Sequence, residues 1–182
     1  MNRQLDTTLL RRGKEADRLA ARGSEEPAAV YREWIRRLLS RRFYTAFELR
    51  HKLIEKGCEP ALAEEISAED AAESARREAV ITEDHIRRGR ESRLIGRSLI
   101  LYELVKRGVR TDKITAALDR DYPVSEENDV ALKLATRKLM AMNDLPPDKQ
   151  SRRLAGMLER RGFLAEVIAR IMNRHRLDKF SE

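Results

Sequence analysis

Leu49-Arg-His-Lys-Leu53-Ile-Glu-Lys56-Gly57-Cys58 is the stretch that decides the fold, because its layout is written three times along the chain. An apolar residue is followed, after three residues, by Leu, and then, after two more, by a basic residue, Gly and a second apolar residue. The other two copies begin at Ile100 and at Leu154. The sequence therefore predicts three units of similar construction.

Each copy has the pattern of a helix that ends at its glycine. Two apolar residues four positions apart lie on one helical face, and a basic residue in the last turn suits the negative end of the helix dipole. Glycine adopts the left-handed conformation that ends many helices. The positions that define the repeat are Leu49, Leu53, Gly57, Ile100, Leu104, Gly108, Leu154, Leu158 and Gly162.

A second helical run follows each glycine, so the predicted unit is helix, glycine stop, helix. The glycines are separated by 51 and then by 54 residues, which is long enough for three helices per unit and is typical of a repeat array. No segment has the two-residue alternation of a strand. We predict an all-α, elongated tandem array of three three-helix, helix-turn-helix-like repeats. The predicted parts are a polar N-terminal arm (1–26), three repeats (27–69, 70–122 and 123–176) and a C-terminal tail (177–182).

Local signals refine this division. Thr45-Ala-Phe-Glu48 has the pattern of a capping box and predicts a helix start. The helix beginning at Pro60 is expected to run into the Ala/Glu-rich segment 61–79, and 119–129 is expected to be a connector. Cys58 and Trp34 are interpreted as core residues, with a reactive thiol and a base-stacking surface as the respective alternatives.

Charge is unevenly distributed along the chain. Charged residues make up 38% of the sequence, aromatic residues only 5%, and the net charge is +7. Residues 31–60, 86–110 and 130–176 carry more basic than acidic side chains, whereas 61–84 and 111–129 carry more acidic ones. Each copy of the repeated pattern lies in a basic block, which indicates an acidic partner or a nucleic acid.

The sequence contains no recognisable catalytic motif. The three histidines lie far apart, there is one cysteine, and no phosphate-binding loop, nucleophile elbow or metal-ligand spacing is present. We therefore predict a non-enzymatic protein with no cofactor and no metal. The first residues lack the apolar segment of a secretory signal and no run approaches 18 apolar residues, so we expect a cytoplasmic protein with no membrane contact.

Basic side chains are the remaining functional signal. For any single Lys or Arg a solvated helical face is the simpler interpretation, but the charges recur in the same part of each unit. Stacked units would place them along one stripe that follows a charged groove. The predicted binding residues are Arg50, Lys52, Lys56, Arg87, Arg88, Arg90, Arg93, Lys106, Arg107, Arg152, Arg153, Arg160 and Arg161.

Three segments of the chain resemble the RecX family of regulatory proteins. They are residues 38–53, Leu104-Val-Lys-Arg107-Gly108-Val109, and Leu158-Glu-Arg-Arg161-Gly162-Phe163 with Ile168 downstream. The resemblance covers about residues 31–174. It departs from the family pattern at 79–85, where an acidic pair followed by an aromatic residue and Ala is usual.

The resemblance implies a partner and a role. RecX proteins are built from tandem three-helix units and bind in the helical groove of RecA recombinase filaments on DNA. They usually restrain the ATPase, strand-exchange and coprotease activities of RecA in recombination and the SOS response. The implied partners are the RecA filament and DNA, single- or double-stranded, contacted directly or through RecA, and the implied state is a monomer.

Two other functions fit the same charge pattern. One is a sequence-tolerant DNA-binding protein with tandem helix-turn-helix-like units, which would bind duplex DNA tightly and with strong salt dependence in the absence of RecA. The other is a scaffold for an acidic protein partner, for which charge is the only support.

Overall fold

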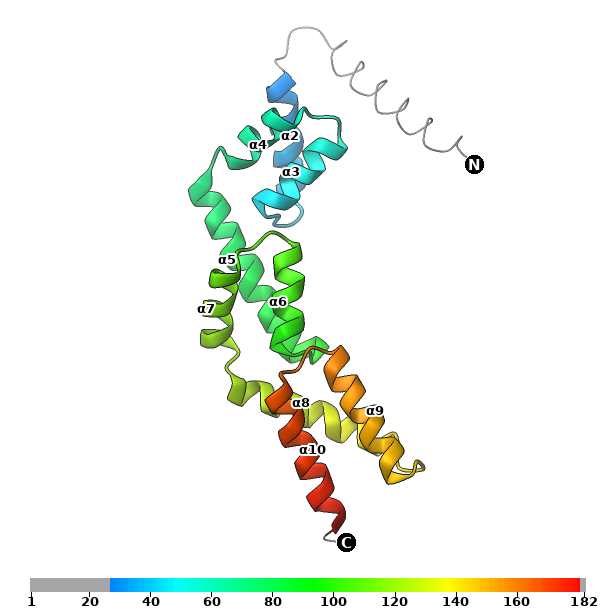
Figure 1. Cartoon of the computed structure of the whole chain (residues 1–182). Coiled ribbons are helices and arrows are strands. Elements are labelled where there is room, and N and C mark those ends of the chain that lie inside the picture. Colours follow the sequence, from blue (N-terminus) through cyan, green and yellow to red (C-terminus); the bar gives the residue numbers. More distant parts are fainter. Residues whose placement is uncertain (1–26, 181–182) are drawn as a thin grey trace, which may run out of the picture. The chain divides into compact units, whose positions relative to one another are not determined.

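The computed structural model describes the backbone of residues 27–180 and the side chains of residues 27–175. All regular structure in this range is helical, which confirms the predicted fold class (Figure 1). The predicted N-terminal arm lies outside the described residues. The chain forms two compact units that divide between Ile81 and Thr82, inside one helix, and each unit is described by itself.

Within its described residues, 27–81, the first unit contains three helices and the beginning of a fourth: α2 (Pro27–Leu39), α3 (Ala46–Glu55), α4 (Pro60–Ala68) and α5 (Ala71–Arg88). Its core consists of aliphatic side chains and the rings of Tyr31 and Tyr44 around Leu49 and Leu53, which are almost completely buried. Trp34 packs against this core and the Cys58 thiol is buried in it, as the sequence predicts. Burial also raises the pKa of Cys58, which makes the nucleophilic thiolate less available.

The start of α3 confirms the predicted capping box. The Thr45 hydroxyl accepts a hydrogen bond from the Glu48 backbone N–H at 3.1 Å, and the Glu48 carboxylate accepts one from the Thr45 backbone N–H at 3.0 Å. The helix that begins at Pro60 runs into the Ala/Glu-rich segment 61–79, as expected, but it ends at Ala68 and a new helix begins at Ala71. Asp70 caps the new helix by accepting a hydrogen bond from the Glu73 N–H at 2.8 Å.

The second unit begins with the last part of α5, which continues into a π-helical turn, η1 (Gly89–Arg93). The helices α6 (Arg97–Lys106), α7 (Thr111–Asp121), α8 (Val124–Met140), α9 (Pro147–Arg160) and α10 (Ala165–Phe180) follow. The last three pack against one another (Figure 1). Since α10 continues to Phe180, residues 177–180 of the predicted tail are helical.

The predicted connector at 119–129 is wrong in this unit. Helix α7 continues to Asp121 and α8 begins at Val124, so only Tyr122 and Pro123 join them. The physical reason is that Pro123 suits the entry to a helix, and the acidic residues after it suit the positive N-terminal end of the helix dipole.

All three repeated glycines end their helices in the same way. Gly57, Gly108 and Gly162 have positive φ angles of 97°, 81° and 72°. The N–H of the following residue donates to the carbonyl of the repeat leucine, from Cys58 to Leu53 at 2.9 Å, from Val109 to Leu104 at 3.1 Å and from Phe163 to Leu158 at 3.2 Å. These are Schellman motifs, and each turns the chain sharply into the next helix. The boundaries proposed for the repeats stay a prediction.

Candidate partner-binding groove

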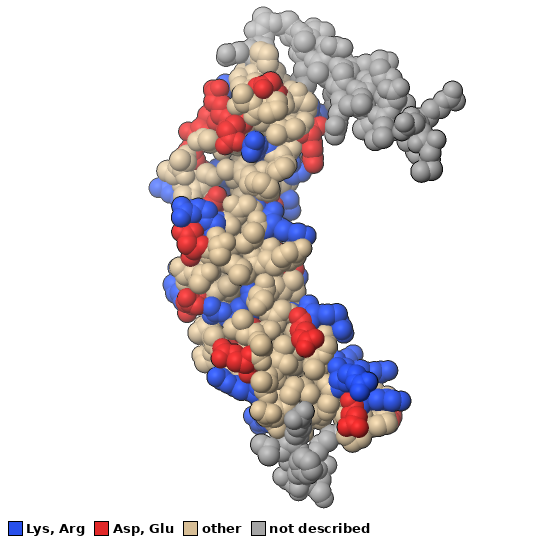
Figure 2. All heavy atoms as spheres, in the orientation of Figure 1, with Lys and Arg blue, Asp and Glu red and all other residues tan. Residues whose placement is uncertain are grey.

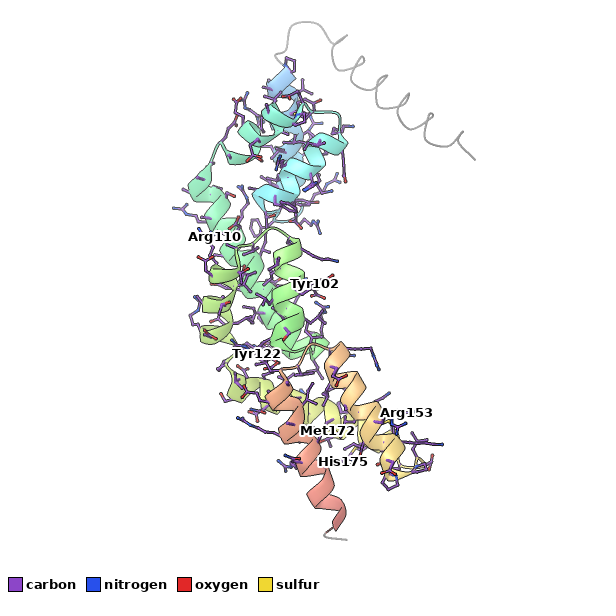
Figure 3. The ribbon with its side chains drawn as sticks, in the orientation of Figure 1. Tyr102, Arg110, Tyr122, Arg153, Met172 and His175 are labelled. Carbon is purple, nitrogen blue, oxygen red and sulfur yellow. The ribbon has the colours of Figure 1, made fainter. Side chains whose placement is uncertain are left out.

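Helix α9 has one buried face and one strongly basic face. Leu154 and Leu158 are fully buried, and Gln150 anchors the loop before the helix by donating to the carbonyls of Met142 (3.0 Å) and Leu145 (2.9 Å). The opposite face carries charged side chains at helical spacing. Figure 2 shows Lys and Arg gathered over this helix, and Figure 3 shows Arg153 projecting away from α10.

A groove of about 840 Å³ lies between this basic face, the end of α8 and the loop that joins them. Its apolar wall comes from both helices and the loop, and its rim is cationic apart from Asp144. The lining residues are Leu134, Lys138, Ala141, Met142, Asp144, Leu145, Arg152, Arg153, Gly156, Met157, Arg160 and Arg161. We refer to it as the α8–α9 groove.

Four of its cations have no ion-pair partner within the part of the chain that the structure describes: Lys138, Arg152, Arg153 and Arg160. All four are exposed. Their positive charges repel one another. An acidic partner would relieve the repulsion, which makes the groove attractive to negative charge.

Arg161, at the end of α9, has a different role. Its guanidinium donates hydrogen bonds to the backbone carbonyls of Arg93 and Leu94, so it joins the end of α9 to the end of η1. It lines the groove but its hydrogen bonds are largely directed inward.

The predicted binding arginines of α5 and η1 are engaged in ion pairs. Arg87 and Arg88 both contact Asp84, at 2.5 and 2.8 Å. Arg93 makes a two-pronged contact with Glu103 at 2.6 and 2.7 Å, and Arg90 bonds both the Asp121 carbonyl and Glu126. Their charge is partly neutralised locally, so they offer less to a partner than the α9 cations do.

The other predicted cations lie on α3 and α6. Arg50 pairs with Glu64 at 2.8 Å, Lys52 lies 5.5 Å from the Tyr44 ring centre, and Lys106 lies 4.7 Å from that of Tyr102. Lys56 and Arg107 are half-buried at the helix C-caps that precede their glycines. Whether the cations of the two units form one stripe stays a prediction.

The hydrogen bonds that hold the α9–α10 junction against the start of α6 and against α8 were not predicted from the sequence. The backbone N–H groups of Gly96 and Ser98 donate to the carbonyls of Arg161 (2.8 Å) and Gly162 (3.0 Å), which brings two helix junctions into direct contact. Glu127, fully buried, accepts hydrogen bonds from the N–H groups of Arg97 and Leu164. Nothing in the sequence signals these pairings, because the partners are 30 to 65 residues apart and Glu127 lies in an acidic run.

A half-buried polar cluster links α5 to α6. The His85 Nε2 lies 2.7 Å from a Glu103 oxygen, and Arg93 contacts the same carboxylate. Burial lowers the pKa of His85, and the hydrogen bond from Arg93 lowers the pKa of Glu103. The cluster fixes the packing of the two helices.

Between residues 27 and 180, no helix has both the length and the hydropathy needed to cross a bilayer. Among the side chains that the structure describes, no group of three or more His, Cys, Asp and Glu is arranged to hold a metal ion.

Comparison with known sequences gives matches to one family. The model of the first three-helix domain of RecX matches residues 36–66, and that of its third three-helix domain matches residues 125–172, which include the whole α8–α9 groove. Over these segments the chain is similar to RecX proteins. It is 36% identical over 95 residues to the regulatory protein RecX of Thermobifida fusca (strain YX), covering 52% of this chain and 51% of that one. It is 41% identical over 87 residues to the regulatory protein RecX of Streptomyces coelicolor, covering 45% of each chain.

Solved RecX structures share the fold. A crystal structure of RecX from Lactobacillus salivarius superposes with a TM-score of 0.70 at 17% identity, covering 82% of this chain and 97% of that one. A second RecX crystal structure gives 0.71 at 19% identity, covering 80% and 73%. The chain spans about half the length of the curated RecX relatives it matches.

Proposed function

We propose that this chain is a non-enzymatic regulatory protein that binds RecA filaments in their helical groove and restrains RecA's ATPase, strand-exchange and coprotease activities. Similarity to RecX proteins supports the regulatory role, since these relatives are named regulatory proteins. The proposal includes a cytoplasmic location and a monomeric state.

The observation that carries the proposal is the uncompensated basic face of α9 beside a groove. Arg152, Arg153 and Arg160 are exposed, have no ion-pair partner in the described part of the chain and lie on one helical face. A nucleoprotein filament offers both phosphates and acidic protein side chains to such a face. A helical protein bound in the filament groove would keep neighbouring protomers from moving relative to one another, and so would slow ATP turnover.

ATP hydrolysis by RecA on single-stranded DNA tests this proposal. Increasing amounts of the purified chain should lower the steady-state rate, and the chain should co-sediment with the filaments. An unchanged rate at saturating protein, together with no co-sedimentation, would contradict it.

A sequence-tolerant DNA-binding function is the second candidate, and the same uncompensated cations favour it. The discriminating measurement is binding to DNA without RecA. Tight duplex binding whose affinity falls steeply with salt concentration would favour this candidate, whereas weak binding to naked DNA with strong binding to filaments would favour the RecA regulator.

A further inference from the structure

The α8–α9 groove combines a charged rim with an apolar wall. Its rim carries the exposed cations Lys138, Arg152, Arg153 and Arg160, and its apolar wall is formed by Leu134, Met142, Leu145 and Met157. Leu134 and Met142 are buried, and Leu145 and Met157 are half-buried. A ligand that used the whole groove would need negative charges at its edges and an apolar surface between them.

Gly156 marks where such a ligand would come closest to α9. It is the tenth residue of a 14-residue helix, where glycine is less favourable than alanine by about 0.5–1 kcal/mol. Nothing inside the chain requires it. It is not among the glycines with positive φ, and an added Cβ would meet only the flexible end of the Arg160 side chain, at 3.3 Å.

The absence of a side chain at this position opens the middle of the basic face. The distance between the axes of two packed helices, about 8–10 Å, depends on the side chains at the crossing, so a residue without a side chain permits a closer approach. Gly156 lies between Arg152 and Arg153 on one side and Arg160 on the other, each within one helical turn. A second helix crossing at Gly156 would therefore have cations on both sides of its path.

Nucleic acid fits this surface less well than a peptide does. Its phosphates would satisfy the cations, but its bases bind best to aromatic side chains, and none lines the groove. Methionine and leucine are instead suited to the aliphatic side chains of an amphipathic helix, since methionine adapts its shape to the residue that meets it. Charge complementarity then requires acidic residues on the two flanks of that helix.

We propose that the α8–α9 groove binds an amphipathic helix with acidic flanks, supplied by the protein component of the RecA filament, and that this helix crosses α9 at Gly156. The inference rests on the proposed function, because it identifies the occupant of the surface used there. Apolar side chains of the bound helix would contact Leu145 and Met157, and its carboxylates would pair with Arg152, Arg153 and Arg160.

Substitutions at Gly156 test the crossing point. Gly156→Ala should raise the melting temperature of the chain, because the helix is stabilised, and yet weaken co-sedimentation with RecA filaments on single-stranded DNA. Gly156→Leu should weaken it further, by roughly tenfold or more, since a larger side chain keeps the two helices apart. Ala169→Leu adds comparable bulk on an exposed face of α10 outside the groove and serves as the matched control.

Photocrosslinking identifies the occupant. The full-length chain with p-benzoylphenylalanine in place of Met157 is bound to RecA filaments, irradiated and analysed by peptide mass spectrometry. The expected product is joined to a RecA segment with apolar residues at helical spacing and acidic residues beside them.

The outcomes separate this inference from the proposed function. If the wild-type chain does not co-sediment with filaments, both the inference and the proposed function are contradicted. If it does, the inference alone is overturned by Gly156→Leu binding as tightly as the wild type, by crosslinks to the DNA, or by crosslinks to a RecA segment that lacks acidic residues.

Discussion

The fully buried Glu127 carboxylate accepts a hydrogen bond from the Arg97 backbone N–H, which joins α8 to the start of α6. The Glu127 Oε1 accepts from the Arg97 backbone N–H at 2.9 Å, at the first turn of α6, and from the Leu164 N–H at 3.2 Å, just before α10. Both N–H groups belong to helix beginnings that have no intrahelical acceptor. One carboxylate therefore replaces two missing hydrogen bonds and fixes the register of α6 against α10.

Removing this carboxylate should loosen the second unit. Glu127→Ala takes the acceptor from two N–H groups and leaves a cavity, so we expect the free energy of unfolding to fall by about 2–4 kcal/mol. Urea denaturation followed by circular dichroism measures it. Glu127→Gln keeps one oxygen acceptor and is the control, with a change of at most about 1 kcal/mol. Equal losses in the two variants would show that the acceptor oxygen does not matter.

The charge of Glu127 should make stability depend on pH. Burial raises the pKa of its carboxyl above the ordinary value of 4.5. The folded state thus binds the proton more tightly than the unfolded state, and the stability this contributes is present below pH 4.5 and lost as pH rises through the folded pKa. We expect Glu127→Gln to gain stability relative to the wild type between pH 4.5 and 8, measured by urea denaturation across that range. If the unfolding free energies of the variant and the wild type changed in parallel with pH, the pH dependence would not come from Glu127.

Features that depend on neighbours in the sequence could be predicted, and those that depend on distant partners could not. The glycine stops and the Thr45 capping box are encoded within about six residues, so their patterns identify them. The burial of Glu127 is decided by residues 30 or more positions away, so nothing in the predicted connector at 119–129 signals it. Arg93 and Arg153 differ for the same reason. Both lie in basic stretches of sequence, but Arg93 is neutralised by Glu103, whereas Arg153 has no ion-pair partner among the described residues.

The glycines of the repeat should differ in how far they tolerate a side chain. A Cβ at Gly162 would lie 2.4 Å from the Leu99 backbone nitrogen, whereas one at Gly57 would meet nothing within 4 Å. Gly57→Ala should therefore cost only the strain of a positive φ, about 1–2 kcal/mol. Gly162→Ala adds a backbone clash and should cost about 3 kcal/mol or more. Thermal denaturation compares them, and equal losses would show that the contact with Leu99 relaxes freely.

His85 should reduce stability in mild acid. Burial lowers its pKa below the ordinary value of 6.5, and this effect outweighs the opposing hydrogen bond to Glu103; the charges of Arg93 and Arg107 lower it further. A lowered pKa means that the unfolded state takes up the proton first, so stability is present above pH 6.5 and lost as pH falls. His85→Gln cannot take up this proton. We expect its unfolding free energy to vary less than that of the wild type between pH 7.5 and 5, and an identical pH dependence would contradict this.

Reversing the charge of Arg152 and Arg153 should weaken filament binding far more than an equal reversal outside the groove. Both residues line the α8–α9 groove and have no ion-pair partner within the described part of the chain, so Arg152→Glu/Arg153→Glu removes no internal ion pair and should leave the circular dichroism spectrum unchanged. We expect the concentration for half-maximal inhibition of RecA's ATPase to rise by about tenfold or more at low salt. The matched control is Lys133→Glu/Arg137→Glu, because these exposed residues lie on α8 outside the groove and give the same change in net charge.

In the same assay, salt concentration distinguishes direct contacts made by the groove from long-range attraction due to the net charge of the chain. Interactions between exposed charges are screened within about 10 Å at 0.1 M salt, so the control variant should approach the wild type as salt increases. The groove variant should keep a deficit, because its glutamates would face carboxylates or phosphates at contact distance, where screening is weak. If both variants are equally impaired and recover together, the net charge of the chain, and not the basic face of α9, determines its binding.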